Sequence, residues 1–239
     1  RDLRMSRGLG DVYKRQKPTL TKKQRHKLRV QQVRRQKIFL TCLFLLIVGC
    51  ILLRFSKFSG RQKETHQINA ACEAYRDEVS SEAAQYDMSD YVDLILAVMM
   101  QESSGQGTDP MQSSEGAYNT RYPQQPNGIT DPSYSISCGI QELKYALEKA
   151  VCTGPTDLAK IRLALQAYNF GADSYFAYLE ENGQTVWTAQ SAQAFAQMAS
   201  GGTQRDEDDP LHDPAGPWDY GDQYYPDHVL RYYHLDNNS

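Results

Sequence analysis

The chain of 239 residues has a formal net charge of −3, but its charges are unevenly distributed. Residues 1–37 carry 14 Lys or Arg against 2 Asp or Glu, and residues 64–239 carry 8 against 27, a net charge of −19. The acidic part would repel nucleic acid, so no nucleic-acid partner is expected, although the basic arm alone could bind nucleic acid or anionic lipid. Five cysteines without a zinc spacing exclude a disulfide scaffold, and neither a metal site nor a cofactor is expected.

An uncharged apolar run follows the basic arm at residues 38–53 (IFLTCLFLLIVGCILL), and the predicted membrane anchor extends to residue 55. At about 1.5 Å per residue this run is roughly 24 to 27 Å long, which spans a bilayer core of about 30 Å when flanking Lys and Arg side chains reach the interface. Cations are concentrated before the run, so residues 1–37 should lie in the cytoplasm and residues from 64 onward outside the cell. We therefore expect a single-pass protein of the cell membrane.

Other interpretations of the N-terminal region are open. A cleaved signal peptide is disfavoured, because the basic region is too long and no small-x-small site follows the apolar run. Cys50 resembles the lipidated cysteine of a bacterial lipoprotein box, although the apolar residues 51–53 after it match poorly. Residues 1–16 show no periodicity and resemble a non-native leader. Residues 56–67 are expected to form a stalk, and residues 68–239 the outer domain.

The outer domain shows helical spacing of apolar residues and no strand alternation of useful length. The expected helices cover 70–85, 91–102, the region around 140–147, 157–165, 188–199 and 226–233. Asp90, with Asp93 three residues on, is the expected N-cap of the second helix. The Pro/Gly-rich residues 105–138 predict a long ordered loop, which inside a compact domain is usually functional. The sequence thus predicts an all-α domain with a long mid-chain loop, preceded by one transmembrane helix.

Glu102 ends a helix that is apolar almost all round (YVDLILAVMMQE). Such a helix belongs in a core, so burial and the negative end of the helix dipole both disfavour the carboxylate and raise its pKa. A general acid needs this placement, because it must keep a proton near neutral pH. The structural alternative is a partly exposed Glu that pairs with a Lys or Arg.

Asp109 lies seven residues after Glu102, beyond a break at Gly105 and Gly107. If the chain folds back there, Asp109 faces Glu102 and can hold a water for attack on a sugar carbon. Two carboxylates about 6.5 to 9.5 Å apart suit inversion at a glycosidic carbon, and a separation of about 5 to 5.5 Å suits retention. The alternative is a turn residue before Pro110.

Three blocks occur in order along the outer domain: MMQESSG at 99–105, SCGIQ at 137–141 and AYNFG at 167–171. Together they resemble the three signature motifs of the goose-type lysozyme and lytic transglycosylase superfamily. The resemblance narrows with MMQESSGQGTDPMQSSEGAYN and with YGDQYYPDHVLRYY near the end, which are similar to the muramidase domain of CwlT-type cell-wall hydrolases. The match covers about residues 68–234.

This resemblance implies a helical lysozyme-like fold with a sugar-binding cleft. It implies hydrolysis of the bond between N-acetylmuramic acid and N-acetylglucosamine in peptidoglycan, by a protein of a Gram-positive bacterium that one N-terminal helix anchors. Peptidoglycan glycan strands are then its partner. Because such proteins occur on conjugative elements, the proteins of a conjugation or secretion channel are further expected partners.

Carried over to this sequence, the resemblance implies that Glu102 protonates the glycosidic oxygen and that Asp109 is the second carboxylate in hydrolysis. Further motif residues would bind the sugar acetamido and hydroxyl groups: Ser103, Ser137, Gln141, Tyr168 and Asn169. Structural roles stay open, since Ser103 could bond the end of its helix, Gln141 could cap its own helix and Tyr168 could belong to the core.

CwlT-type proteins usually continue into a papain-like NlpC/P60 peptidase domain, which needs a Cys nucleophile and a His. This sequence ends at Ser239 before such a domain, so either a fragment or a one-domain variant is expected, without peptidase activity. Cys138 lies inside a motif block and is expected to be a small buried residue rather than a nucleophile.

Three other functions compete with hydrolysis. A lytic transglycosylase would use Glu102 without Asp109 and leave 1,6-anhydromuramic ends. A non-catalytic wall-binding component of a transfer channel would use the fold only for docking. A cytoplasmic regulator that binds DNA through the basic arm would require the apolar run to be soluble core.

Overall fold

Helices form the regular structure of the part that the computed structural model describes, residues 66–209 and 212–235. In chain order they are α2 (Ala70–Glu73), α3 (Arg76–Gln85), the 3₁₀ turn η1 (Ser89–Tyr91), α4 (Val92–Glu102), α5 (Pro132–Lys149), α6 (Leu158–Phe170), α7 (Ala172–Glu181), α8 (Ala189–Ala199) and α9 (Tyr225–Leu230). Within these ranges the only β-type pairing is an isolated bridge between Gln204 and Trp218. The prediction of an all-α domain is confirmed for this part of the chain.

The predicted arm, the anchor at residues 38–55 and the stalk up to residue 65 lie outside the described residues. Among the helices of the described part, none is both long and apolar enough to cross a bilayer. The predicted membrane topology therefore stays a prediction.

Helix α4 is the centre of the hydrophobic core. Its residues 94–99 are consecutive and fully buried, each with 0 % of its surface exposed. Helices α2 and α3 pack against it, and α9 packs against it as well. A helix with neighbours on several sides has to be apolar around most of its circumference, which explains the sequence pattern.

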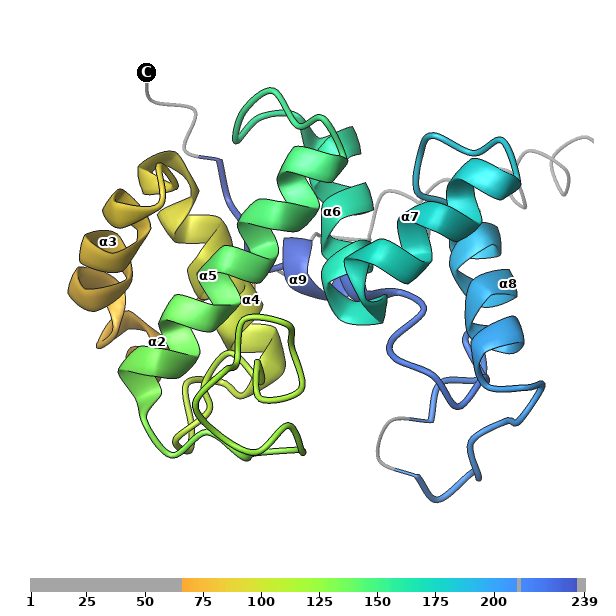
Figure 1. The fold of residues 1–239 in the computed structure, drawn as a ribbon, viewed down its shortest axis with the longest axis horizontal. Coiled ribbons are helices and arrows are strands. Elements are labelled where there is room, and N and C mark those ends of the chain that lie inside the picture. The colour runs from red at the N-terminus through yellow and green to blue at the C-terminus, as the bar shows by residue number, and fades with distance from the viewer. Residues whose placement is uncertain (1–65, 210–211, 236–239) are drawn as a thin grey trace, which may run out of the picture. The chain divides into compact units, whose positions relative to one another are not determined.

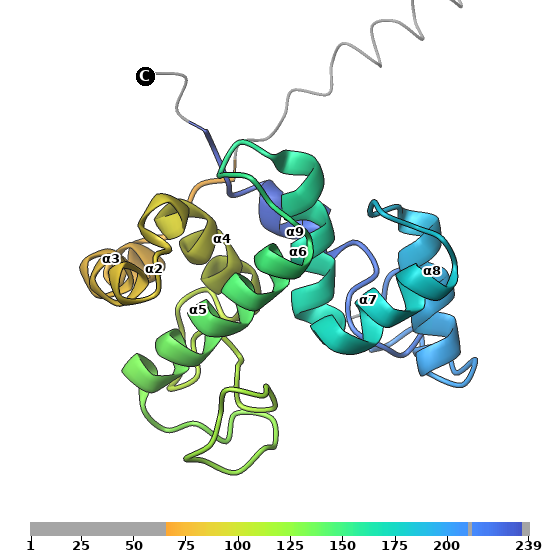
Figure 2. The same cartoon turned by 45° about the horizontal axis from the view of Figure 1, so that its top comes forward.

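Helices α6 and α9 lie between two groups of helices (Figures 1 and 2). One group consists of α2 to α5, and the other is the pair α7 and α8. Helix α6 contacts α5, α7 and α9, and α9 also contacts α4. The ends of α4, α6 and α9 are thus brought together from three distant parts of the sequence.

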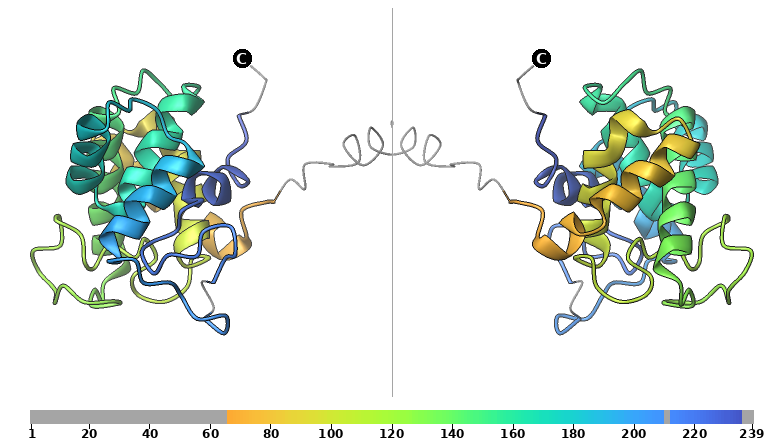
Figure 3. Two further views of the ribbon diagram at one scale, coloured as in Figure 1. Left: turned by 90° about the vertical axis from the view of Figure 1, so that its right-hand side faces the viewer. Right: turned by 90° about the vertical axis from the view of Figure 1, so that its left-hand side faces the viewer.

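The predicted mid-chain loop is confirmed and occupies residues 103–131, between α4 and α5. It extends away from the helices on one side of the domain (Figures 1 and 3). Gly105 starts the loop in the left-handed region, with φ of 73°, and a Cβ there would lie 2.8 Å from the backbone nitrogen of Cys72. Only glycine tolerates both the positive φ and this close approach. Gly105 therefore lets the turn after α4 lie directly against α2.

Two predicted boundaries are wrong. The loop ends at Asp131 rather than at residue 138, because the Asp131 carboxylate accepts hydrogen bonds from the amides of Ser133 and Tyr134 and starts α5. Pro132, which contributed to the loop signal, occupies the first turn of α5, where proline is favoured. Asp90 does not cap α4: it lies inside η1, and the cap position is Tyr91, without a side-chain hydrogen bond.

Helix α5 packs on the loop through a glycine. A Cβ at Gly139, in the SCGIQ block, would lie 2.6 Å from the Cβ of the fully buried Met111. The close approach of helix and loop therefore leaves no room for a methyl group at this position.

We expect Gly139→Ala to lower the free energy of unfolding by about 1 to 3 kcal/mol, because the added methyl overpacks the interface between α5 and Met111. Urea unfolding measures this change. Gly154→Ala is the matched control, since a Cβ at Gly154 meets nothing within 4 Å. Equal stability of both variants would contradict the close contact.

Candidate active site

Glu102 is the last residue of α4, and its carboxyl group meets α9. The Tyr225 hydroxyl donates a hydrogen bond to Oε1 of Glu102. The two residues are 123 positions apart in the sequence. This contact between α4 and α9 holds the carboxyl group in one orientation.

The half-buried Glu102 side chain borders a cavity of about 600 Å³. The wall of the cavity comes from the end of α4, the mid-chain loop at Gln112, the end of α6, residues within 205–209 and 212–224, and α9 with the residue that follows it. Its lining residues are Gln101, Glu102, Gln112, Asn169, Arg205, His212, Asp213, Pro214, Gly216, Gly221, Asp222, Gln223, Tyr224, Tyr225, His228 and Arg231. The volume lies in the range typical of small-ligand sites.

The electrostatic surroundings of Glu102 favour its protonated form. Burial raises its pKa to about 7, the Tyr225 hydrogen bond lowers it, and the nearby carboxylates of Asp222 and Asp109 raise it. No described Lys or Arg forms an ion pair with it. The structural alternative of a paired helix-end Glu is therefore not what the domain shows.

Asp222 is held beside Glu102 by α6. The Asn169 side-chain oxygen accepts a hydrogen bond from the Asp222 amide at 2.7 Å, and the Gln166 side chain donates to the Asp222 carbonyl at 2.8 Å. The Asp222 carboxylate lies 2.5 Å from Nδ1 of His228, and this contact raises the pKa of His228. Asn169 of the AYNFG block thus lines the cavity and positions the turn that carries Asp222.

Asp109 is buried, with 2 % of its surface exposed, and does not line the cavity. One carboxylate oxygen accepts from the Ser113 amide at 3.0 Å and the Ser135 hydroxyl at 2.6 Å. The other accepts from the amide and the hydroxyl of Ser114. With four donors in place, Asp109 ties the start of the loop to α5, and it acts on Glu102 through its charge.

Tyr168 lies among three carboxyl groups, those of Glu102, Glu142 and Asp109, whose charges add to burial in raising its pKa. Its hydroxyl donates to the Met111 carbonyl at 3.0 Å, and its ring is stacked near that of Tyr225, with centroids 6.3 Å apart. Tyr168 therefore supports the residue that holds Glu102.

The other three motif residues are outside the cavity lining. Ser103 donates to the Pro110 carbonyl at 2.8 Å and closes the turn after α4. Gln141 donates to the carbonyl of Ser137 one helical turn earlier, and the Ser137 hydroxyl lies 3.0 Å from that of Tyr86. Their predicted contacts with sugar remain predictions.

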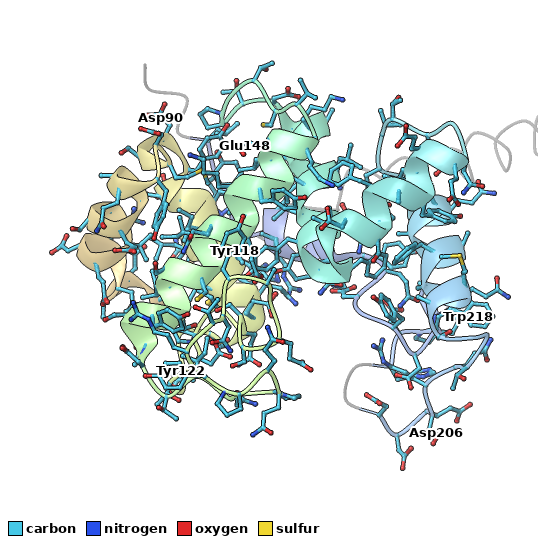
Figure 4. The ribbon with its side chains drawn as sticks, in the orientation of Figure 1. Asp90, Tyr118, Tyr122, Glu148, Asp206 and Trp218 are labelled. Carbon is cyan, nitrogen blue, oxygen red and sulfur yellow. The ribbon has the colours of Figure 1, made fainter. Side chains whose placement is uncertain are left out.

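Sequence reasoning missed Glu142, which directly follows the SCGIQ block. Burial raises its pKa to about 7, and one of its carboxyl oxygens has no hydrogen-bond partner among the described residues. Its side chain fills the space at Gly116, beneath the part of the loop whose Tyr118 lies over α5 (Figure 4). A polar residue at this helical position carried no local signal of burial.

The arrangement suits proton transfer. A carboxyl group with a pKa of about 7 keeps a proton close to neutral pH and can give it to a bound group in the cavity. Among the described residues, no group of three or more His, Cys, Asp or Glu is placed to hold a metal ion. The three described cysteines, Cys72, Cys138 and Cys152, are free thiols, and Cys138 is buried as expected.

Comparison with known proteins agrees with this geometry. A family model described as lysozyme-like matches residues 70–233. The chain belongs to the lysozyme-like family.

Within this family, the expected CwlT-type resemblance is confirmed. The chain is 35% identical over 169 residues to the bifunctional muramidase/DL-endopeptidase CwlT of Bacillus subtilis, a match covering 71% of this chain and 44% of CwlT. It is 37% identical over 110 residues to a pneumococcal vaccine antigen A homolog of Streptococcus pyogenes, covering 46% of this chain and 50% of that protein. The chain thus spans half or less of the length of these relatives.

A solved structure shares the fold of this lysozyme-like chain. It is described as similar to a lipoprotein of the NLP/P60 family from Staphylococcus aureus. The likeness has a TM-score of 0.60 and 27% identity, and covers 73% of this chain and 56% of the other. The fold of about three quarters of this chain is therefore shared with an experimental structure.

Asp109→Asn is expected to destabilise the lysozyme-like domain, because an amide presents a donor to the hydroxyls and amides that now face a carboxylate. Bonds to a charged group contribute about 1.5 to 3 kcal/mol each, so the free energy of unfolding should fall by about 2 kcal/mol or more. Urea unfolding measures it. Asp131→Asn, which keeps an N-cap acceptor at the surface, should cost less than about 1 kcal/mol.

Tyr225→Phe removes the hydrogen bond that lowers the pKa of Glu102, so this pKa should rise above about 7. Glu102 then stays protonated to higher pH. Carbon-13 NMR titration of the Glu102 carboxyl group measures the shift. The control is Tyr224→Phe, because the Tyr224 hydroxyl also borders the cavity but donates to the Ala215 carbonyl. An unchanged or lower pKa in Tyr225→Phe would contradict the role of this contact.

Proposed function

We propose that this domain cleaves the glycan strands of peptidoglycan, with Glu102 as the general acid. The observation that carries the proposal is a carboxyl group with a pKa of about 7 on the wall of a cavity of about 600 Å³. The similarity to a protein named as a muramidase supports the substrate class. The bond proposed to be cleaved joins N-acetylmuramic acid to N-acetylglucosamine.

In the first step, Glu102 protonates the glycosidic oxygen as the bond to the sugar carbon breaks. Because the pKa of Glu102 is about 7, about half of the protein molecules carry a proton on Glu102 at pH 7. The Tyr225 phenol keeps its own proton, since burial raises its pKa well above the usual value, so it continues to donate to the carboxylate that forms. Tyr225 thereby orients the acid before transfer and stabilises its charge afterwards.

The second step decides between hydrolysis and transglycosylation. Hydrolysis, the leading proposal, needs a group that holds the attacking water, and Asp109 is the candidate that the family motifs suggest. The engagement of both Asp109 oxygens with four donors favours the alternative, a lytic transglycosylase that uses Glu102 alone. In that case the muramoyl 6-hydroxyl is the attacking group, and a 1,6-anhydro end results.

The cellular setting is part of the same proposal. With residues 38–55 as a single-pass anchor and the N-terminus in the cytoplasm, the domain would act on the wall just outside the membrane of a Gram-positive cell. Local opening of the wall there suits a conjugation or secretion channel. A non-catalytic docking role remains the competing function.

We expect Glu102→Gln to abolish clearing in a peptidoglycan zymogram, because glutamine cannot give a proton to the glycosidic oxygen. Loss of at least about a hundredfold in rate is expected for a general acid. Glu180→Gln, which neutralises an exposed Glu on α7, is the matched control and should clear normally. Clearing by Glu102→Gln at the wild-type rate would exclude Glu102 as the general acid, and absence of clearing by the wild-type protein would leave docking as the function.

Mass analysis of the wild-type digest separates the two reactions. Reducing muramic ends indicate hydrolysis, and ends lighter by one water indicate the 1,6-anhydro product of a transglycosylase. An Asp109→Asn variant that remains folded adds to this comparison, because only hydrolysis would need its carboxylate.

A further inference from the structure

The cavity beside Glu102 contains cationic groups in a domain that is otherwise strongly acidic. Residues 64–239 have a net charge of −19 with only 8 Lys or Arg, yet Arg205 and Arg231 both line this one cavity. His228 also lines it, and its contact with Asp222 raises its pKa and so favours its cationic form. The carboxylates of Asp213 and Asp222 line the same cavity, so each cation there is compared with the acid that could balance it.

Arg205 has a structural reason. Its side chain is 8 % exposed, it donates to the Gly221 carbonyl at 2.9 Å, and its Nε lies 3.5 Å from the Asp219 carboxylate. Arg205 therefore holds the turn at Gly221, next to Glu102, and its charge is partly balanced by Asp219.

Arg231 has no comparable balance. It is exposed at the end of α9 and forms no ion pair with a described carboxylate. One guanidinium nitrogen donates to Oε1 of Gln101 at 3.0 Å, and the group lies over the Tyr232 ring at 4.8 Å. These contacts fix the guanidinium next to the residue that precedes Glu102, while most of its five N–H donors stay available.

His228 lies three residues before Arg231, so both side chains are on one face of α9. The positive charge of Arg231 lowers the pKa of His228, which agrees with their proximity, while Asp222 raises it. Nδ1 of His228 faces Asp222, and Nε2 forms no hydrogen bond with any residue of the described part. We call Arg231 and His228 the α9 cation pair.

We infer that the α9 cation pair binds a carboxylate of the substrate, one that the muramoyl unit carries and that an N-acetylglucosamine unit lacks. This inference rests on the proposed function, since it takes peptidoglycan glycan as the substrate. A guanidinium forms two parallel bonds to a carboxylate, and a fixed guanidinium loses little freedom in doing so. The chemistry is the same for the free lactyl carboxylate and for a carboxylate of the attached peptide.

The position of the α9 cation pair gives it a role in substrate selection. It lines the same cavity as Glu102, so a muramoyl carboxylate bound there places a neighbouring glycosidic oxygen toward the acid. Chitin-like chains have no such carboxylate and would gain nothing from the pair. The α9 cation pair would thus distinguish peptidoglycan from other N-acetylated glycans.

The experiment compares two tetrasaccharides of equal length. Binding to the full chain carrying Glu102→Gln is measured calorimetrically with (N-acetylglucosaminyl-N-acetylmuramic acid)₂, which has free lactyl carboxylates, and with chitotetraose, which has none. We expect the muramoyl ligand to bind about tenfold more tightly. Adding Arg231→Gln should reduce this preference to about twofold or less, and Arg231→Lys should retain part of it.

Arg121→Gln is the matched control. Arg121 is also exposed and lies over a tyrosine, Tyr134, at 4.6 Å, but it does not line the cavity. Its loss should leave the preference unchanged. Equal binding of chitotetraose and of the muramoyl tetrasaccharide both with and without its peptides, or an equal effect of Arg121→Gln and Arg231→Gln, would overturn the inference.

A third ligand, the same tetrasaccharide with its peptides attached, identifies the source of the carboxylate. If the Arg231 dependence appears already with free lactyl groups, the lactyl carboxylate suffices, and if it appears only with peptides, a peptide carboxylate is bound. The readout needs no bond cleavage. Failure of the zymogram test would therefore sink the proposed activity, whereas loss of the ligand preference would sink this inference alone.

Discussion

The hydrogen bond from Tyr225 to Glu102 joins the centre of the fold to its site. Glu102 is the last residue of a helix whose residues 94–99 are fully buried, so its position is set by the core. Tyr225 opens α9 from the far end of the chain and is itself buried. Because both backbones are fixed by packing, the carboxyl group keeps one orientation at the edge of the cavity without an ion pair to any described residue. That condition keeps its pKa near 7.

Two irregular segments, the mid-chain loop and the segment between α8 and α9, contribute residues near the contact between Tyr225 and Glu102. In the loop 103–131, the Asp109 carboxylate accepts hydrogen bonds from the amides of Ser113 and Ser114. It also accepts one from a side chain of α5, the Ser135 hydroxyl. The second segment, described at residues 203–209 and 212–224, is held by α6 at Asp222 and by Arg205 at Gly221. Trp218 lies on this second segment near the lower end of α8 (Figure 4). Each segment contributes an acid whose charge raises the pKa of Glu102, although only Asp222 also borders the cavity.

The parts that could be predicted from sequence are those with a local signal. The apolar helix ending at Glu102, the break at Gly105 and the long loop after it all follow from periodicity and glycine positions. Helix α7 was not predicted, because it buries only Tyr175 and Leu179, and two buried positions are too few to show a helical period. The buried position of Asp109 was not predicted for another reason. The sequence cannot show whether its carboxylate oxygens accept hydrogen bonds from the loop amides or face a cavity. The contact of Tyr225 with Glu102 was not predicted, because the two residues are 123 positions apart and such a contact leaves no pattern in the local sequence.

The same features that suit Glu102 to proton transfer also shape how the fold responds to pH. Burial raises the pKa of both Glu102 and Glu142 from 4.5 to about 7. The folded state therefore holds two protons that the unfolded chain has released between about pH 4.5 and pH 7, so the contribution of these groups to stability is full below this window and is lost as pH rises through it. The net charge of −19 on residues 64–239 acts in the same direction, because mutual repulsion of carboxylates grows over that interval. Acid function and acid-favoured stability thus share one cause, the placement of carboxyl groups where burial weakens the solvation of their charge.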